Sequence, residues 1–176
     1  MDSALADAGL VERALEGDQG AFAAIVAAHH GDMARVAYVV SGDVEVAEEA
    51  VQAAWSVAWR KLATLREPTS LRPWLVAVAA NEARQMLRRR NRMGVVELDL
   101  GTVAANDADP SGRIERLDLV RELRRLRPED RALIALRYVA GLDSREIGPL
   151  VGKSASGVRG ELSRIVARLR EELGDA

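Results

Sequence analysis

The stretch from Asp143 to Arg170 constrains the fold most, because it predicts two helices joined by a tight turn. Asp143 and Glu146 have the spacing of a capping box at the start of the first helix. Gly152 suits the left-handed conformation that ends a helix, and Ser154 can cap the next one. The second helix has apolar residues at helical spacing: Val158, Leu162, Ile165, Val166 and Leu169.

Such a pair of helices, with arginines along the second, is typical of a DNA-binding helix-turn-helix. Gly148 supplies the short side chain that is needed where the two helices cross. Pro149 falls inside the first helix, where its ring and missing amide cost up to ~3 kcal/mol, so we expect that helix to be short or distorted. A plain helical hairpin is the alternative, since amphipathic helices are common.

The composition favours an all-α fold of two small helical domains. Hydrophobic residues make up 48% of the 176 residues but aromatic residues only 3%, so the core must consist mostly of Ala, Val and Leu. Without cysteine there is no disulfide frame, thiol nucleophile or zinc-finger cluster. No apolar stretch approaches the ~20 residues of a membrane span and no signal peptide is evident. We therefore expect a cytoplasmic protein without membrane insertion.

Charge alternates along the chain, although the net charge is only −2. Residues 81–93 carry 5 basic and 1 acidic side chains, whereas residues 94–115 carry 1 basic and 5 acidic ones. Residues 1–80 are net acidic and residues 116–176 net basic. Both basic zones are predicted helices, which indicates a protein that contacts phosphates at two separate places.

Two helices are predicted before residue 41, over residues 4–15 and 19–40, with Asp18 as the cap of the second. His29 and His30 lie in the second of these helices. Adjacent residues point in different directions on a helix and no third ligand is in sight. We therefore predict that both histidines are surface residues and form no metal site.

A third helix is predicted over residues 44–65. Trp55 and Trp59 lie on one side of it, where core packing is the simpler interpretation. The other side is acidic and carries Glu45, Glu48, Glu49 and Gln52. This acidic face either is merely solvated or docks on a basic partner, and both alternatives stay open at this point.

A fourth helix is predicted after Pro68, with Ser70 as its cap, through the sequence LRPWLVAVAANEARQMLRRRNR. Its end holds the densest charge in the chain: Arg84, Arg88, Arg89, Arg90 and Arg92. Arginines at a helix C-terminus complement the helix dipole, but five in nine residues exceed that need. A role facing phosphates is therefore favoured.

The periodicity fails after this helix. We divide the chain into an N-terminal domain (1–93), an acidic flexible linker (94–112) and a C-terminal helix-turn-helix domain (113–176). In the C-terminal domain a helical block starts near Arg113 and a further helix is predicted over residues 129–140. With such a linker, the free protein is expected to be flexible between its two domains, and a partner could clamp them together.

Four stretches of the sequence are informative when they are taken together: VAEEAVQAAWSVAWRKL, LRPWLVAVAANEARQMLRRR, LRPEDRALIALRYVAGLDSREIGPLVG and SASGVRGELSRIVARLREEL. In this order, with a linker between the second and third, they resemble bacterial RNA polymerase sigma factors of the extracytoplasmic-function (ECF) group of the sigma-70 family. The resemblance covers about residues 21–92 and 117–173. Trp74, Leu75, Ala79 and Asn81 lie on the family motif of the second stretch.

The resemblance implies a non-enzymatic subunit that directs core RNA polymerase to promoters and initiates transcription. It implies docking on core polymerase through Glu48, Glu49 and Gln52. It also assigns contacts with the −10 promoter element: Asn81 and Gln85 to base edges, and Arg84, Arg88 and Arg89 to phosphates. The residues near DNA at the −35 element would be Ser154, Ser156, Arg159, Ser163 and Arg164.

The resemblance further implies the partners of the chain. They are core RNA polymerase, promoter DNA and an anti-sigma factor that controls the protein in the bacterial cytoplasm. We expect a monomer when the protein is free, and no catalytic residue, metal or cofactor.

The sequence departs from the family pattern in four places. Ala53 and Ala54 replace polar residues after the docking glutamine, and Gln85 stands where Asp is frequent. Glu161 replaces a basic residue of the recognition helix, and Pro149 interrupts the helix before it. A carboxylate repels phosphates but can accept a hydrogen bond from a cytosine amine, so we expect an altered −35 preference.

Two other functions remain as alternatives. One is a helix-turn-helix regulator that binds duplex DNA without polymerase, which would make the N-terminal resemblance accidental. The other is a sigma-like protein that acts mainly through protein–protein interaction. An enzyme is the weakest interpretation, since the sequence offers no phosphate-binding glycine loop, metal cluster or nucleophile beside a base.

Overall fold

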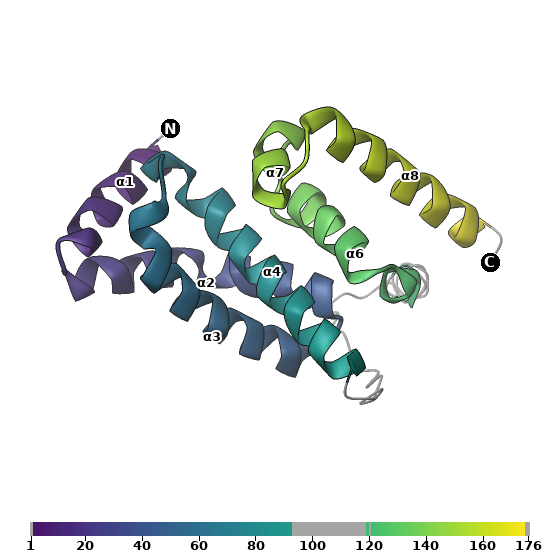
Figure 1. Ribbon diagram of the computed structural model, residues 1–176, viewed down its shortest axis with the longest axis horizontal. Coiled ribbons are helices and arrows are strands. Elements are labelled where there is room, and N and C mark those ends of the chain that lie inside the picture. The colour runs from purple at the N-terminus through teal and green to yellow at the C-terminus, as the bar shows by residue number, and fades with distance from the viewer. Residues whose placement is uncertain (1, 93–118, 120, 175–176) are drawn as a thin grey trace, which may run out of the picture.

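The computed structural model describes residues 2–92, 119 and 121–174, and every regular element in them is helical (Figure 1). The N-terminal domain contains α1 (Asp2–Leu15), α2 (Gln19–Ser41), α3 (Val44–Lys61) and α4 (Leu71–Arg92). The C-terminal domain contains α6 (Pro128–Ile134), the π-helical turn η3 (Ala135–Val139), α7 (Ser144–Val151) and α8 (Ala155–Gly174). The all-α prediction is confirmed. The predicted linker and the helix start near Arg113 lie outside the described residues.

Local capping sets where the N-terminal helices begin. The carboxylate of Asp18 accepts a hydrogen bond from the Ala21 amide at 3.0 Å, and that of Asp43 accepts one from the Val46 amide at 2.8 Å. The predicted third helix was too long, because α3 ends at Lys61. Two 3₁₀ turns, η1 (Leu62–Thr64) and η2 (Pro68–Ser70), then lead the chain into α4.

The N-terminal core is made of small and aliphatic side chains, as the composition predicts. Helix α4 packs on both α2 and α3. Ala50, Ala54 and Ala58 present buried methyl groups on α3, and Leu71 and Leu75 are buried on α4. Alanines on one helix face allow close approach of neighbouring helices, so this domain has a dense core with few aromatic rings.

The surface prediction for His29 is wrong. His29 is only 5% exposed, and its Nε2 lies 3.1 Å from Oδ1 of Asp7 on α1. Sequence spacing could not reveal this pair, because it forms only when α1 folds back on α2. His30 is exposed, as predicted, and its Nδ1 accepts a hydrogen bond from the Trp55 indole at 3.3 Å.

The turn between α7 and α8 forms as the sequence predicts. The Asp143 carboxylate accepts from the Glu146 amide at 3.0 Å, and the Glu146 carboxylate accepts from the Asp143 amide at 2.7 Å, which completes a capping box. Gly152 ends α7 with φ +69°. Helix α7 is 8 residues long and contains Pro149, so it is short as predicted. The helix predicted over residues 129–140 is instead α6 followed by the π-helical turn η3.

The two domains are packed against each other. Helix α6 and η3 contact α2 and α4, and α7 also contacts α4. In Figure 1 α6 and α7 lie between α4 and α8, which leaves α8 on the outer side. Arg72 of α4 donates to the Ala140 carbonyl at 3.0 Å, and Arg124 donates to the Gly42 carbonyl at 2.8 Å. The structure thus holds the two domains in contact, whereas the linker predicted flexibility between them.

Candidate functional site: a nucleic-acid and polymerase interface

The N-terminal end of α8 is built from exposed serines. Ser154 accepts a hydrogen bond from the Gly157 amide at 3.1 Å and so caps the helix, and its Oγ lies 3.1 Å from that of Ser156. Both serines are exposed. A capped N-terminus with exposed hydroxyl groups and the positive end of the helix dipole suits contact with a phosphate or a base edge.

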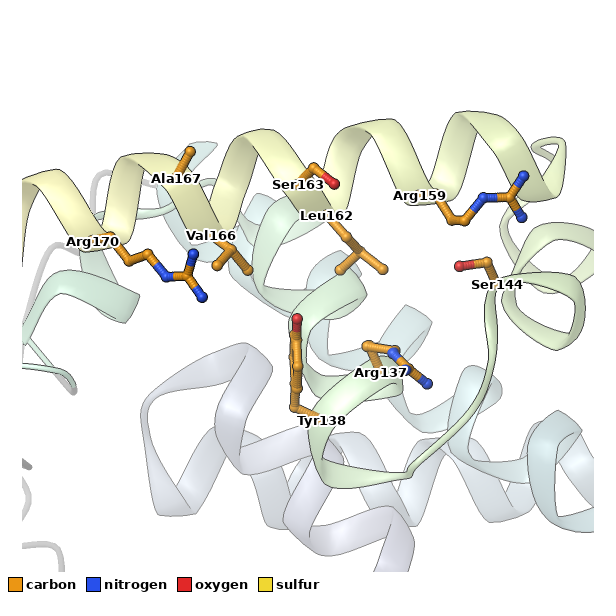
Figure 2. Close-up of a pocket in the computed structure, with 9 residues that line it drawn as sticks. All are labelled: Arg137, Tyr138, Ser144, Arg159, Leu162, Ser163, Val166, Ala167 and Arg170. Atoms are coloured by element: carbon orange, nitrogen blue, oxygen red, sulfur yellow. The ribbon is translucent and has the colours of Figure 1, made fainter.

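One turn further along, α8 faces η3 across an open groove of about 450 Å³ (Figure 2). Arg159 and Ser163, both predicted to lie near DNA, line this groove. Residues that the sequence reasoning had missed line it as well: Arg137, Tyr138, Ser144 and Arg170. Three arginines, Arg137, Arg159 and Arg170, thus line the same groove and give it a cationic character.

Arg137 and Tyr138 lie in the segment LRYVAG, directly before the helix-turn-helix. A basic residue next to an aromatic residue was the only sequence signal for them. Arg137 is held by a hydrogen bond from its Nη1 to the Leu142 carbonyl at 3.0 Å. That bond fixes the guanidinium at the groove, so the helix before the helix-turn-helix contributes to the cationic surface.

Glu161 and Arg164 do not line the groove. Arg164 is exposed, and its Nε donates to the Gly160 carbonyl at 3.2 Å. Glu161 forms an ion pair with Lys153, at 2.5 and 2.6 Å from Nζ to its two oxygens, and lines a separate cavity beside α6. Lys153 therefore neutralises the carboxylate of Glu161, which replaces the basic residue that the family usually has at this position of α8. Glu161 lines a different cavity from Arg159.

The predicted −10 contact residues become more exposed toward the C-terminal end of α4. Arg84 donates to Oδ1 of Asn81 at 3.0 Å, and Gln85 donates to Glu82 at 3.3 Å. Asn81, Arg84 and Gln85 are half-buried. Arg88 and Arg89 are exposed. Arg88 is paired with Glu129 of the C-terminal domain. The five predicted −10 contact residues thus lie along one stretch of α4, and α4 packs next to α6.

The acidic face of α3 is open. Glu48, Glu49 and Gln52 are exposed, and Oε2 of Glu49 lies 4.0 Å from Nη2 of Arg90. Trp59 is 48% exposed, so the prediction that it packs in the core is wrong. Its ring lies edge-on to Phe22, with centroids 4.7 Å apart, at the outer side of the domain. Trp59 follows Gln52 by seven residues, so it lies on the acidic face rather than on the opposite side, and that face ends in an exposed aromatic ring.

Among the described residues, no three His, Cys, Asp or Glu side chains are grouped in a way that could hold a metal ion. No described helix is long and apolar enough to cross a membrane. The chemistry available at these surfaces is that of charge, hydrogen bonding and aromatic contact.

Asp130 ties α6 to the recognition helix. It is 6% exposed and accepts hydrogen bonds from Arg127 at 2.9 and 3.1 Å and from Arg168 of α8 at 3.3 Å. Burial acts to raise the pKa of Asp130, but the hydrogen bonds and charges of Arg127 and Arg168 outweigh it and lower that pKa.

Because the pKa of Asp130 is lower in the folded state, its stabilising effect is complete above the unfolded pKa of about 3.9 and is lost as the pH falls through the folded value. We expect Asp130→Asn to lower the free energy of unfolding of the C-terminal domain by about 1–2 kcal/mol at pH 7. The difference from native should shrink below about pH 4. Urea unfolding of both proteins, from pH 7 to below about pH 4, measures this difference in the free energy of unfolding. The exposed Glu171→Gln serves as control, and an equal loss there would contradict the assignment.

Two family models match the chain. The model described as Sigma-70 region 2 matches residues 25–93, and the one described as Sigma-70, region 4 matches residues 116–169. The RNA polymerase sigma factor CarQ of Myxococcus xanthus is 34% identical over 174 residues, which cover 94% of this chain and 96% of CarQ. The chain belongs to the sigma-70 family of RNA polymerase sigma factors. The resemblance carried by the four sequence stretches is confirmed.

The relatives also place this sigma factor in the ECF group. The ECF RNA polymerase sigma-E factor of Escherichia coli K12 is 32% identical over 180 residues, which cover 93% of this chain and 92% of that protein. The chain spans only 42% of the length of the "Probable RNA polymerase sigma factor RfaY" of Xanthomonas campestris, to which it is 34% identical. Sigma factors are non-catalytic subunits, and this one directs RNA polymerase to promoters.

Two solved structures share the fold of this sigma factor. CnrH, in complex with the cytosolic domain of CnrY, has a TM-score of 0.73 at 24% identity and covers 97% of this chain and 98% of that one. The sigma factor RpoE of Bartonella quintana, in complex with the anti-sigma factor NepR, has a TM-score of 0.72 at 22% identity and covers 87% of this chain and 96% of that one.

Proposed function

We propose that this sigma factor divides promoter recognition between its two domains. The N-terminal domain, residues 1–93, docks on core polymerase through Glu48, Glu49 and Gln52 and reads the −10 element with α4. The C-terminal domain, residues 113–176, reads the −35 element with α8. The observation that best supports this division is the groove of Figure 2, where three arginines and the exposed side of α8 form one cationic surface.

At the −35 element, α8 would enter the major groove with its N-terminal end. Ser154 and Ser156 would meet the DNA first, and Arg159 and Ser163 would follow one turn on. Arg137 and Arg170 line the same groove as Arg159, so we assign them to phosphate contacts. Arg164 lies beside this surface and would reach an adjacent phosphate.

At the −10 element, an unstacked base would be received near the start of α4. Extrusion of a base costs a few kcal/mol, which a shaped polar pocket can offset. Asn81 and Gln85 are one helical turn apart and would contact base edges. Arg84, Arg88 and Arg89 would hold phosphates, whose neutralisation makes binding dependent on salt.

The chain would act in the bacterial cytoplasm as a monomer under the control of an anti-sigma factor. RpoE of Bartonella quintana has been solved with the anti-sigma factor NepR, and CnrH with the cytosolic domain of CnrY, and both share this fold. A protein inhibitor of this kind would cover the polymerase-docking or DNA-reading surfaces.

Run-off transcription tests the proposal. Bacterial core polymerase is incubated with and without the protein on a promoter library from the source genome. We expect initiation that requires the protein, with selected promoters that share a −10 and a −35 element. Arg159→Ala should lower run-off from promoters with the preferred −35 element about tenfold and relax the preference there, since a bidentate base contact is worth ~1–3 kcal/mol.

Other outcomes would point to other functions. Retained polymerase binding without initiation would mean a protein that acts through protein–protein interaction. Tight binding to duplex DNA without any binding to polymerase would mean an independent helix-turn-helix regulator.

A further inference from the structure

The turn between α7 and α8 carries a cation that the promoter contacts assigned above do not use. Lys153 lies in this turn, directly before Ser154, and is exposed. Its amide donates to the Gly148 carbonyl at 2.9 Å, and its own carbonyl oxygen lies where a β-carbon on Gly148 would be 2.7 Å away. The backbone of Lys153 is therefore fixed against α7, next to the end of α8 that is assigned to DNA.

The ammonium group of Lys153 is held by Glu161 of α8. Both carboxylate oxygens of Glu161 lie close to Nζ of Lys153, at 2.5 and 2.6 Å. The two residues are 8 positions apart, so the pair ties the turn to a point roughly two helical turns along α8. The two side chains are 43% and 30% exposed, so a competing phosphate can reach the lysine once the carboxylate is removed.

The other cations around Glu161 are engaged elsewhere. Arg84 and Arg127 line the same cavity of about 250 Å³ as Glu161 and Lys153. Arg127 donates to Asp130 at 2.9 and 3.1 Å, and Arg84 donates to the side chain of Asn81 at 3.0 Å. The Glu161 carboxylate is therefore left to Lys153.

Glu161 does not lie on the side of α8 that is assigned to base contacts. Successive residues of an α-helix are rotated by roughly 100°, so residues two positions apart point to nearly opposite sides. Glu161 is two positions from Arg159 and from Ser163, which both line the groove of Figure 2. Glu161 lines the other cavity, beside α6. The carboxylate can therefore act on bound DNA through the lysine that it holds.

Lys153 is suited to a phosphate contact once it is released. A lysine ammonium is a compact charge with three donors on a flexible four-carbon stem. The stem of Lys153 starts beside Ser154, which caps α8 and is assigned to the −35 DNA. Each additional phosphate that a protein neutralises steepens the dependence of DNA binding on salt. Release of Lys153 should therefore be visible as one more phosphate contact.

We propose that Glu161 is a positioning residue that withholds Lys153 from the DNA backbone at the −35 element, so that this sigma factor binds its promoters with one phosphate contact fewer than its basic residues permit. The inference rests on the function proposed above, in which α8 reads the −35 element. It assigns the carboxylate of Glu161 to affinity, whereas the sequence predicted an altered base preference. Base preference then stays with Arg159 and the serines of α8.

The first experiment tests the ion pair in the full chain without DNA. Lys61 and Lys153 are the two lysines of the sequence, so isotope labelling of lysine gives two side-chain ammonium signals in nuclear magnetic resonance spectra. Glu161→Gln should shift the Lys153 signal and leave that of Lys61, at the end of α3, unchanged. Glu171→Gln should change neither signal. An unchanged Lys153 signal in Glu161→Gln would overturn the pairing and the proposal with it.

The second experiment measures promoter binding by the holoenzyme. Core polymerase with the full chain is titrated onto a promoter fragment selected by run-off, at several salt concentrations. Glu161→Gln should tighten binding about three- to eightfold near 0.1 M salt and steepen the logarithmic salt dependence by about 0.9, the value of one phosphate. Lys153→Gln alone should keep the native salt dependence, and Lys153→Gln combined with Glu161→Gln should return binding to native. Glu171→Gln, which removes an equal charge from α8, should match native.

The two single variants and the double variant separate the explanations. A gain in Glu161→Gln that persists without Lys153 would mean that the carboxylate acts by its own charge. A shallower salt dependence in Lys153→Gln would mean that the lysine already contacts DNA. A lower melting temperature in Glu161→Gln with no change in salt dependence would mean a purely structural pair. Each of these results overturns the proposal.

Failure of the proposed function is recognised separately. If the native holoenzyme shows no promoter binding while the lysine signals still report the pair, the reading of the −35 element by α8 fails, and the role of Glu161 in DNA binding fails with it. If native binding is normal and Glu161→Gln changes neither its strength nor its salt dependence, the role of Glu161 fails alone.

Discussion

Gly148→Ala is expected to destabilise the C-terminal domain by about 2–3 kcal/mol, because a β-carbon at this position would collide with backbone. It would lie 2.7 Å from the Lys153 carbonyl oxygen and 3.5 Å from the Ala155 nitrogen. Backbone atoms in a tight turn cannot rotate away as a flexible side chain can. The crossing of α7 and α8 must therefore open, which moves the recognition helix.

Gly160→Ala is a matched control in the same domain. A β-carbon there meets nothing within 4 Å, and Gly160 is exposed on α8. Replacement by alanine in a helix should stabilise the domain by about 0.5–1 kcal/mol. Urea unfolding of the two variants should thus give changes of opposite sign. Equal and small effects would mean that the turn relaxes around the extra methyl group.

Reversing two charges on α3 is expected to weaken the binding of core RNA polymerase at least tenfold. Glu48→Lys with Glu49→Lys replaces exposed acidic groups by basic ones on the face assigned to docking. If the partner surface is basic, each reversed charge changes attraction into repulsion, and like charges at an interface cost several kcal/mol. A tenfold change corresponds to about 1.4 kcal/mol, so this expectation is conservative.

Glu12→Lys with Glu16→Lys provides the control, because it changes the net charge equally at two exposed residues, one on α1 and one in the turn directly after it. Binding to core polymerase is measured by competition at low and high salt. The effect of the α3 variant should shrink as salt rises, since exposed charges are screened. Equal weakening by the control would indicate a general charge effect and would remove the docking assignment from α3.

Local features of the fold could be predicted from the sequence because they depend on residues close together in the chain. The capping box of Asp143 and Glu146, the left-handed Gly152 and the short α7 with Pro149 all formed as expected. Each involves contacts within about one helical turn, where the spacing of residues fixes the geometry. The family was likewise readable, since it resides in the order of four linear motifs.

Burial at individual positions was harder to predict, because a helix face can be covered by an element that is distant in sequence. His29 became buried when Asp7 of α1 met it, and Trp59 stayed at the surface beside Phe22. The sequence showed that both were on amphipathic helices but not which neighbour would cover each face. Helix crossing angles decide that, and they arise from the packing of many side chains.

The sequence by itself therefore determined most of the helices, several of their caps, the family and the arginine-rich zones predicted to contact phosphate. Only the tertiary structure decided which of those residues are available. It gathered Arg137 and Arg170 with Arg159 in one groove, turned Glu161 toward Lys153, and placed Glu129 on Arg88. The physical reason is range: caps and periodicity act over a few residues, whereas charge pairing between domains depends on how two complete surfaces dock.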